Sequence, residues 1–201
     1  MPPSAPPPEL IVATTSRYRL ALLDRLGLAY RAVAHRVDER AAEPEGTPEH
    51  VATTLARAKA ESLAAAFPDA LILGSDQVVA LDDELLHKPG DAARAVAQLA
   101  RLAGRTHRIV TAVALRGPDG RVDTHLDVHT MRMRALPEAA LRAYVAADEP
   151  YDCAGSYKIE GRGIALFESA AGQDYTGIIG LPLTAVVTLL ARAGVHVFPP
   201  A

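Results

Sequence analysis

A short apolar segment in the middle of the chain carries a single carboxylate. Residues 71–79 read L-I-L-G-S-D-Q-V-V, so that Leu, Ile and Val surround Asp76. Such a run, bounded by polar segments, is typical of a strand that is buried on both faces. A buried carboxylate is costly unless a cation, a metal or a ligand pairs with it. Folding alone would favour an aliphatic residue at position 76, so the sequence indicates that Asp76 serves a function.

Strand patterns alternate with helix patterns along the rest of the chain. The expected strands cover residues 10–13, 29–35, 71–79, 108–116, 122–133 and 163–167. The expected helices cover residues 16–27, 49–66, 91–102, 137–147 and 182–193, and a polar loop covers residues 41–48. The turn formed by residues 117–120, G-P-D-G, joins two of the strands as a hairpin. This order predicts a mixed α/β sheet.

Length and composition limit the class of protein. A chain of 201 residues allows one large domain, which we expect over residues 9–201, after a Pro-rich extension at residues 1–8. One cysteine excludes an internal disulfide, which favours a reducing cytoplasm. A net charge of -3 without a basic block argues against a nucleic-acid polymer as partner. No apolar segment approaches the roughly 18 to 20 residues of a membrane span.

Several cationic side chains fall where an anion could bind. The loop at residues 14–19 precedes a helix, and backbone N–H groups at a helix N-terminus bind anions; the alternative is an ordinary N-cap at Ser16. Lys59 lies on one helical face with Val51 and Leu55, so it either extends to solvent or points at a negative group. Lys88 follows the Asp76 strand and reads by itself as a loop lysine.

Acidic residues supply the complementary half of such a site. Glu39 ends an acidic V-D-E segment, which by itself reads as a solvated strand end. Together with Asp76 it provides the oxygen ligands that a hard divalent cation prefers. Phosphate-binding cations (Arg19, Lys59 and Lys88) beside two acids fit nucleoside triphosphate hydrolysis better than acyl transfer or redox chemistry.

Two further groups of residues have plainer interpretations. Cys153 has no neighbouring His and Asp arrangement and is expected to be inert, and Ser156 does not lie in a G-x-S-x-G elbow. On one face of a strand, His125, Asp127 and His129 follow one another at every second residue, which would suit a metal. The solvated face of a hairpin is the favoured interpretation of that trio.

The motifs, taken in order, resemble one known family. They are T-T-S-R-Y-R-L-A-L-L, V-D-E, A-R-A-K-A, G-S-D-Q-V, H-K-P, G-R-T-H, C-A-G-S-Y-K-I-E-G-R-G-I-A-L-F-E and G-L-P-L. From residue 10 to residue 190 the chain resembles the Maf proteins, which are nucleoside triphosphate pyrophosphatases. The resemblance implies hydrolysis of a nucleoside triphosphate to the monophosphate and pyrophosphate with a divalent metal (Mg, Mn or Co). It also implies an elongated mixed sheet with flanking helices, a cleft between two lobes as in inosine triphosphatases, and a homodimer.

The resemblance also implies roles for individual residues. Asp76 matches the catalytic acid that accepts a proton, and Glu39 with Asp76 would hold the metal. The positions around the triphosphate are Ser16, Arg19, Lys59 and Lys88. This chain departs from the usual S-P-x-R-R motif, because Arg17 replaces Pro and Leu20 replaces the second Arg. We expect that Arg17 compensates for the missing cation in the phosphate grip.

Three positions distinguish branches of the family by the base of the nucleotide that each branch prefers. Here they are Tyr18, Gln77 and Glu160, which resembles the 7-methyl-GTP branch rather than the branch acting on dTTP and UTP. Methylation at N7 leaves a positive charge on guanine, which an aromatic ring can stack upon and a carboxylate can attract. The Gln77 amide can both donate and accept.

Two alternatives remain open at the level of the sequence. One is a pyrophosphatase for dTTP, UTP or a broad range of non-canonical nucleotides. The other is a nucleotide-binding regulator of septum formation that needs no catalysis. Since neighbouring side chains on a strand point to opposite faces, a regular strand would separate Asp76 from Gln77. We therefore expect the strand to end, bulge or bend at residues 74–77.

Overall fold

The computed structural model describes residues 8–42 and 44–198. Its strands are β1 (Leu10–Ala13), β2 (Arg31–Val33), β3 (Leu71–Leu81), β4 (Glu84–Leu86), β5 (Thr106–Arg116), β6 (Val122–Met133) and β7 (Phe167–Ala171). Its α-helices are α1 (Arg17–Asp24), α2 (Glu39–Ala42), α3 (Pro48–Glu61), α4 (Ala92–Leu102), α5 (Glu138–Asp148), α6 (Tyr175–Ile179) and α7 (Leu183–Arg192). Two short 3₁₀ helices are η1 (Ala154–Ser156) and η2 (Arg162–Leu166).

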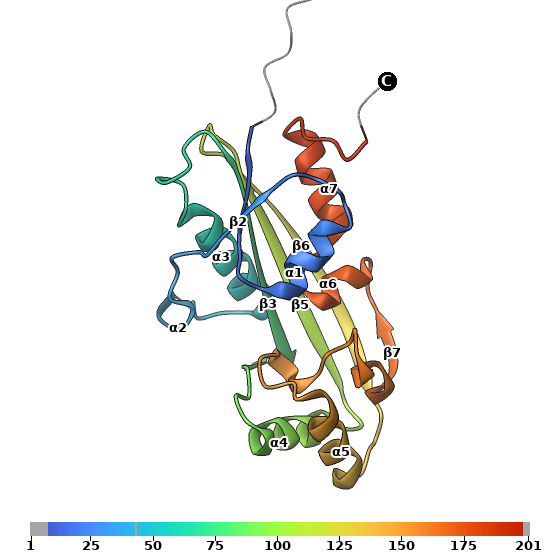
Figure 1. Ribbon diagram of the computed structural model, residues 1–201. Coiled ribbons are helices and arrows are strands. Elements are labelled where there is room, and N and C mark those ends of the chain that lie inside the picture. Colours follow the sequence, from blue (N-terminus) through green and yellow to red (C-terminus); the bar gives the residue numbers. More distant parts are fainter. Residues whose placement is uncertain (1–7, 43, 199–201) are drawn as a thin grey trace, which may run out of the picture.

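The strands form one mixed sheet in the order β2-β1-β3-β5-β6-β7, with β4 paired to β3. Strands β2, β1 and β3 are parallel, whereas β3, β5, β6 and β7 are antiparallel. The long strands β3, β5 and β6 run the length of the molecule, which is elongated (Figure 1). The mixed α/β sheet predicted from the alternating patterns is therefore confirmed.

Helices cover the two faces of this sheet in separate groups (Figure 1). Helix α3 packs on one face, around an apolar cluster that includes Ile11, Ile72 and Val110. At one end of the other face, α1 and α7 pack on Leu73 and Val113. At the opposite end, α4 and α5 enclose a third cluster with Val79 and its neighbours. Two lobes thus share the same long strands.

The contact between α3 and β3 is unusually close. A Cβ atom at Gly74 would lie 2.3 Å from the carbonyl oxygen of Ala56 and 2.8 Å from the backbone nitrogen of Ala60. Small residues at positions 52, 56 and 60 form the buried face of α3 that faces the sheet. This approach sets the helix directly over β3, next to Asp76.

One edge of β3 is uncovered between the two lobes. Strand β1 pairs with β3 only as far as Leu73, and β4 pairs with it only from Val79 onward. Within the part of the chain that the structure describes, residues 74–78 of β3 therefore have no strand neighbour on this edge. A ligand that enters at this gap can reach side chains on both faces of the strand.

Several expectations differ from the structure. Strand β3 runs without interruption through residues 74–77, in regular register with β5, so the predicted bulge is wrong. The strand expected at residues 163–167 is instead η2, followed by β7. The expected polar loop at residues 41–48 contains the end of α2, and α3 ends at Glu61 rather than at residue 66. The sequence patterns also missed β4, α6 and α2, and Glu39 begins α2 rather than ending a strand.

Most of the Pro-rich extension expected at residues 1–8 lies outside the described residues. No helix within residues 8–42 and 44–198 combines the length and the apolar character that crossing a membrane requires.

Candidate active site

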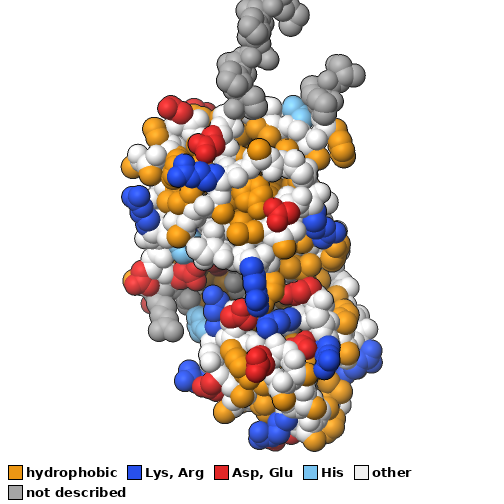
Figure 2. Space-filling view, viewed as in Figure 1, with side chains coloured by type: hydrophobic (Ala, Val, Ile, Leu, Met, Phe, Trp, Pro, Cys, Tyr) orange, Lys and Arg blue, Asp and Glu red, His pale blue; other side chains and the backbone are white. Residues whose placement is uncertain are grey.

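The uncovered edge of β3 opens into two adjoining cavities. The first, of about 550 Å³, is lined by residues of the β1–α1 loop and of the segment before η2, and it includes Gln77. The second, of about 530 Å³, lies on the other side of the strand and is lined by Asp76. Glu39, Gln77 and Lys88 line both cavities. Charged side chains of both signs gather across the waist between the two lobes (Figure 2).

A buried lysine joins the two acids of the site. The ammonium group of Lys59 lies 2.6 Å from Oδ1 of Asp76 and 2.7 Å from Oε1 of Glu39. Lys59 is only 1% exposed and Asp76 only 5%. Burial by itself would raise the pKa of the Glu39 carboxyl, but the hydrogen bond and the charge of Lys59 outweigh it and lower that pKa. Lys59 therefore points at negative groups and does not extend to solvent.

A second cation lies beside this trio. The Nε atom of Arg19 donates to the carbonyl oxygen of Gly180 at 3.0 Å, and Oγ of Ser75 donates to the same oxygen. Burial lowers the pKa of the Arg19 guanidinium, and the charges of Asp76 and Glu39 partly offset this effect. One side of the guanidinium is thus anchored to the backbone, while Arg19 lines the first cavity.

The other two residues assigned to phosphate binding, Ser16 and Lys88, also line the cavities. Lys88 is exposed and lines both cavities. Ser16 precedes α1 as the N-cap residue, but its side chain makes no capping hydrogen bond. Its backbone N–H donates to the side chain of Thr14. The Ser16 side chain is therefore not committed to the helix that it begins.

The three residues assigned to base recognition line the first cavity. Glu160 is exposed there, whereas Tyr18 is partly buried. The guanidinium of Arg17 lies over the Tyr18 ring, 4.8 Å from its centroid, and donates to the Tyr18 hydroxyl at 2.8 Å. Arg17 also lies 3.9 Å from Asp152. Arg17 therefore contacts the aromatic residue of the site, and the expectation that it takes the place of the missing phosphate cation has no support in these contacts.

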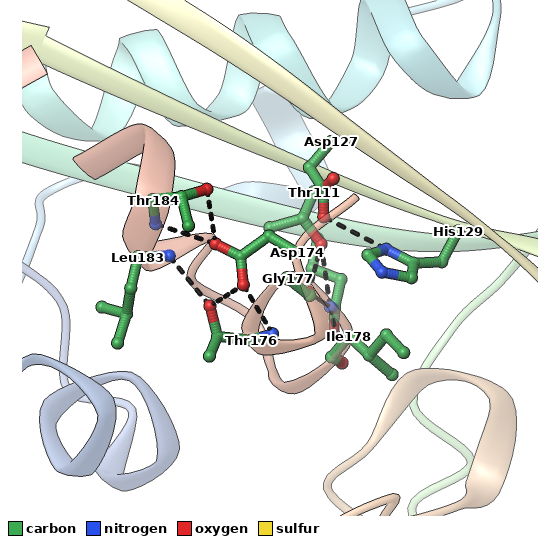
Figure 3. A network of polar contacts seen from close by, with 10 residues as sticks. Thr111, Asp127, His129, Asp174, Thr176, Gly177, Ile178, Leu183 and Thr184 are labelled. Atoms are coloured by element: carbon green, nitrogen blue, oxygen red, sulfur yellow. Dashed lines mark hydrogen bonds and ion pairs between the residues drawn. The ribbon is translucent and has the colours of Figure 1, made fainter. Parts of the chain in front are cut away.

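A buried polar network behind Gln77 was not expected. Asp127 and His129 are 3% and 2% exposed, and Nδ1 of His129 lies 3.1 Å from Oδ2 of Asp127. Figure 3 shows both facing helix α6, which carries Thr176, Gly177 and Ile178. The solvated hairpin face predicted for this trio is therefore wrong for Asp127 and His129, and holds only for His125, which is exposed. The alternating pattern located the shared face, but the covering helix α6 gave no sequence signal.

Cys153 lines the first cavity without being reactive. Burial, together with the charge of the neighbouring Asp152, raises the pKa of its thiol to about 12. Because the thiolate is the nucleophilic form, this thiol is a poor nucleophile at neutral pH.

The carboxylates fit a divalent metal that is shared with a substrate. Within residues 8–42 and 44–198, no three His, Cys, Asp or Glu side chains form a metal cage of their own. Asp76 and Glu39 converge on one ammonium group, so their carboxylates lie within reach of a common ion. Mg²⁺ typically takes one or two carboxylates and completes its shell with water and substrate phosphates. The residues present meet that requirement.

All nine residues predicted for the site gather at this cleft. Seven line the first cavity, namely Ser16, Tyr18, Arg19, Glu39, Gln77, Lys88 and Glu160. Asp76 lines the second cavity, and Lys59 lies beneath both, bound to Asp76 and Glu39. Sequence reasoning did not find Thr111, whose hydroxyl contacts Gln77 from the adjacent strand β5.

Comparison with known proteins identifies the family. The sequence profile of the family described as Maf-like protein matches residues 9–193. A Xanthomonas campestris protein named 7-methyl-GTP pyrophosphatase is 46% identical over 187 residues, which cover 93% of this chain and 97% of that protein. A Hahella chejuensis protein of the same name is 41% identical over 194 residues, with 96% and 98% covered. Among solved structures, the Staphylococcus aureus Ham1 protein overlaps 77% of this chain and 89% of its own, with a TM-score of 0.45 and 15% identity. The chain belongs to the Maf-like protein family.

Proposed function

We propose that the protein is a nucleoside triphosphate pyrophosphatase that hydrolyses 7-methyl-GTP to 7-methyl-GMP and pyrophosphate. The observation that carries this proposal is the Lys59 ammonium held between Asp76 and Glu39 at the floor of a cleft. A site that only binds nucleotides has no need of a buried acid beneath its phosphates. Relatives of this chain that carry the name 7-methyl-GTP pyrophosphatase support the choice of substrate.

The proposed reaction breaks the bond between the α-phosphorus and the bridging oxygen to the β-phosphate. A water attacks the α-phosphorus, Asp76 accepts its proton, and pyrophosphate leaves with the bridging oxygen. Lys59 binds Oδ1 of Asp76 and so orients the carboxylate for proton transfer. Arg19 and Lys88 stabilise the negative charge that spreads over the phosphate oxygens.

A divalent cation would be held by Asp76 and Glu39 together with the triphosphate. When bound, it supplies Lewis-acid stabilisation of charge on the phosphate oxygens. At the other end of the substrate, Tyr18 would stack on the base, and Glu160 would attract the charged 7-methylguanine ring. A homodimer and a cytoplasmic location remain predictions that follow from the family resemblance and the cysteine content.

Pyrophosphate release from a panel of nucleotides tests the proposal. The purified protein is assayed with 7-methyl-GTP, GTP, UTP and dTTP, each with Mg²⁺, with Mn²⁺ and with a chelator. We expect metal-dependent release that is fastest from 7-methyl-GTP. A preference for UTP or dTTP would refute the base assignment while leaving the reaction type intact. No release from any nucleotide would instead favour a regulator that binds without catalysis.

A further inference from the structure

The side-chain amide of Gln77 has only one orientation open to it. Its Nε2 atom donates to Oγ1 of Thr111 at 2.9 Å, to the carbonyl oxygen of Gly177 at 2.8 Å and to that of Ile178 at 2.9 Å. Carbonyl oxygens only accept, so the nitrogen and not the oxygen must face them. An amide nitrogen carries two N–H groups, and three acceptors already share them. Gln77 therefore has no N–H left for a ligand.

The oxygen of the same amide is open to the cavity. Within residues 8–42 and 44–198, Oε1 of Gln77 has no hydrogen-bond partner, and it is not one of the enclosed unpaired atoms. Gln77 lines the first cavity. Gln77 thus presents an acceptor to whatever occupies that cavity, rather than the donor and acceptor that an unrestrained amide offers.

The two carbonyl groups that hold the amide are themselves rigidly placed. Asp174 accepts four hydrogen bonds, from the backbone and hydroxyl groups of Thr176 and Thr184, and so ties α6 to α7. A Cβ atom at Gly177 would lie 1.8 Å from Oδ2 of Asp127, so α6 packs directly on the buried Asp127–His129 pair. Figure 3 shows Asp174 bonded to both Thr176 and Thr184.

Thr111 completes the support from the sheet. It lies opposite Gln77 in the register of β3 and β5, so that both side chains share one face. Its buried hydroxyl donates to the Gly177 oxygen at 2.8 Å, which leaves only its lone pairs for the Gln77 N–H. The Thr111 hydroxyl therefore fixes the direction of its hydrogen bond to Gly177 and of the one from Gln77. An aliphatic side chain of the same shape would make neither bond.

We propose that Thr111 is a positioning residue that makes Gln77 an acceptor-only contact for the base, and that the cavity therefore selects bases presenting N–H donors. The inference rests on the proposed function. Glu160, a second acceptor, lines the same cavity. Guanine presents adjacent N1–H and N2–H donors, which suit two acceptors. Uracil and thymine present one N–H between two carbonyl oxygens, which would face Gln77 and Glu160 unfavourably.

Replacing Thr111 with Val tests the proposal, with Thr111→Ser as the matched control. In Thr111→Val the Gln77 amide loses one of its three acceptors, and the Gly177 carbonyl loses the hydroxyl that fixes its direction, so the amide can turn toward the cavity. The readout is kcat/KM for GTP against two analogues. In XTP a carbonyl acceptor replaces the 2-amino donor of guanine. In 2-aminopurine riboside triphosphate N1 carries no hydrogen and is an acceptor instead of a donor. We expect at least one of the two ratios to fall about tenfold or more in Thr111→Val, and both to stay within about twofold in Thr111→Ser. Unchanged ratios in a folded Thr111→Val protein would overturn the proposal.

A second measurement on the unaltered protein covers the case in which Thr111→Val does not fold. The side-chain amide protons of Gln77, assigned through bonds from its backbone by NMR, should exchange with water at least about tenfold more slowly than those of the exposed Gln173. Equal exchange would refute the fixed orientation. If the wild-type protein released no pyrophosphate from any nucleotide, the proposed function would fail, while slow exchange at Gln77 would still support the fixed amide.

Discussion

At the scale of single residues, the site depends on one ammonium shared by two carboxylates. Asp76 is tolerated in a buried strand because Lys59 neutralises it at 2.6 Å. Removing one partner of a buried pair leaves an uncompensated charge, which typically costs 3 to 5 kcal/mol. The same contact that makes Asp76 compatible with the fold also holds its carboxylate in place for proton transfer.

Replacing Asp76 with Asn is expected to remove most of the activity and leave the fold intact. The amide cannot accept the proton of the attacking water, so kcat should fall by about 10² to 10⁴-fold. Because Lys59 keeps Glu39 as a partner, its charge is not left uncompensated, and thermal unfolding should show a loss well below the roughly 3 to 5 kcal/mol of a fully broken buried pair. Asp69→Asn, at an exposed residue outside the cavities, is the control. An Asp76→Asn protein with wild-type turnover would remove Asp76 from the mechanism.

Replacing Arg17 with Ala is expected to sharpen the preference for the methylated base. The Arg17 guanidinium lies over the Tyr18 ring, where its charge opposes that of 7-methylguanine. Without it, the ratio of kcat/KM for 7-methyl-GTP to that for GTP should rise about threefold or more. Arg25→Ala, at the C-cap of the same helix and outside the first cavity, should leave the ratio unchanged. A ratio that falls in Arg17→Ala would show that Arg17 assists the substrate instead.

At the scale of elements, the position of α3 on β3 determines whether Lys59 reaches Asp76. The helix approaches so closely because Gly74 has no side chain and the facing residues of α3 are alanines. The helix pattern placed Lys59 on the apolar face, but the depth of the approach depends on a glycine in another element. Local sequence patterns do not contain such a pairing.

Replacing Gly74 with Ala is expected to destabilise the protein and to impair catalysis. The added Cβ would lie 2.3 Å from a backbone oxygen of α3, so the helix must shift. Overpacking of this kind costs about 1 to 3 kcal/mol, measurable by denaturant unfolding. Turnover should fall as well, because Lys59 moves with the helix. The control is Gly120→Ala, where φ is 83° and the added atom meets open space. Gly120→Ala should lower the free energy of unfolding only because an alanine rarely adopts this φ, and it should leave turnover unchanged.

At the scale of the whole molecule, the lobe built on α4 and α5 contains a histidine that cannot easily accept a proton. His107 is 2% exposed and lies 2.8 Å from the Tyr157 hydroxyl. Burial lowers the pKa of His107 to about 4. Since an unfolded histidine titrates near 6.5, the unfolded chain binds more protons than the folded protein between these values.

Stability should therefore decrease as the pH falls from about 6.5 to about 4. The contribution of His107 to this decrease is roughly 3 kcal/mol. Denaturant unfolding at a series of pH values should show it, and His107→Gln should remove that part of the pH dependence. The exposed His125, replaced with Gln, should leave the slope unchanged. An unaltered slope in His107→Gln would mean that His107 is not protonated on unfolding.

Local sequence patterns were sufficient to predict most of the element types and the residues that form the site. Strands β1, β5 and β6 and helices α4, α5 and α7 lie close to their predicted ranges, because each shows its own apolar period and its own turn or cap residues. The nine site residues, which share a cleft, could be predicted because each lies in a motif that resembles those of the family.

The arrangement of those residues depends on contacts between distant segments of the chain. An unbroken β3 places Asp76 and Gln77 on opposite faces, and both remain accessible because β1 ends and β4 begins on either side of them. The burial of Asp127 and His129 and the fixed amide of Gln77 depend on α6, which comes from a distant part of the chain. Strand ends, sheet edges and covering helices result from pairing between distant segments, and no local period in the sequence encodes that pairing.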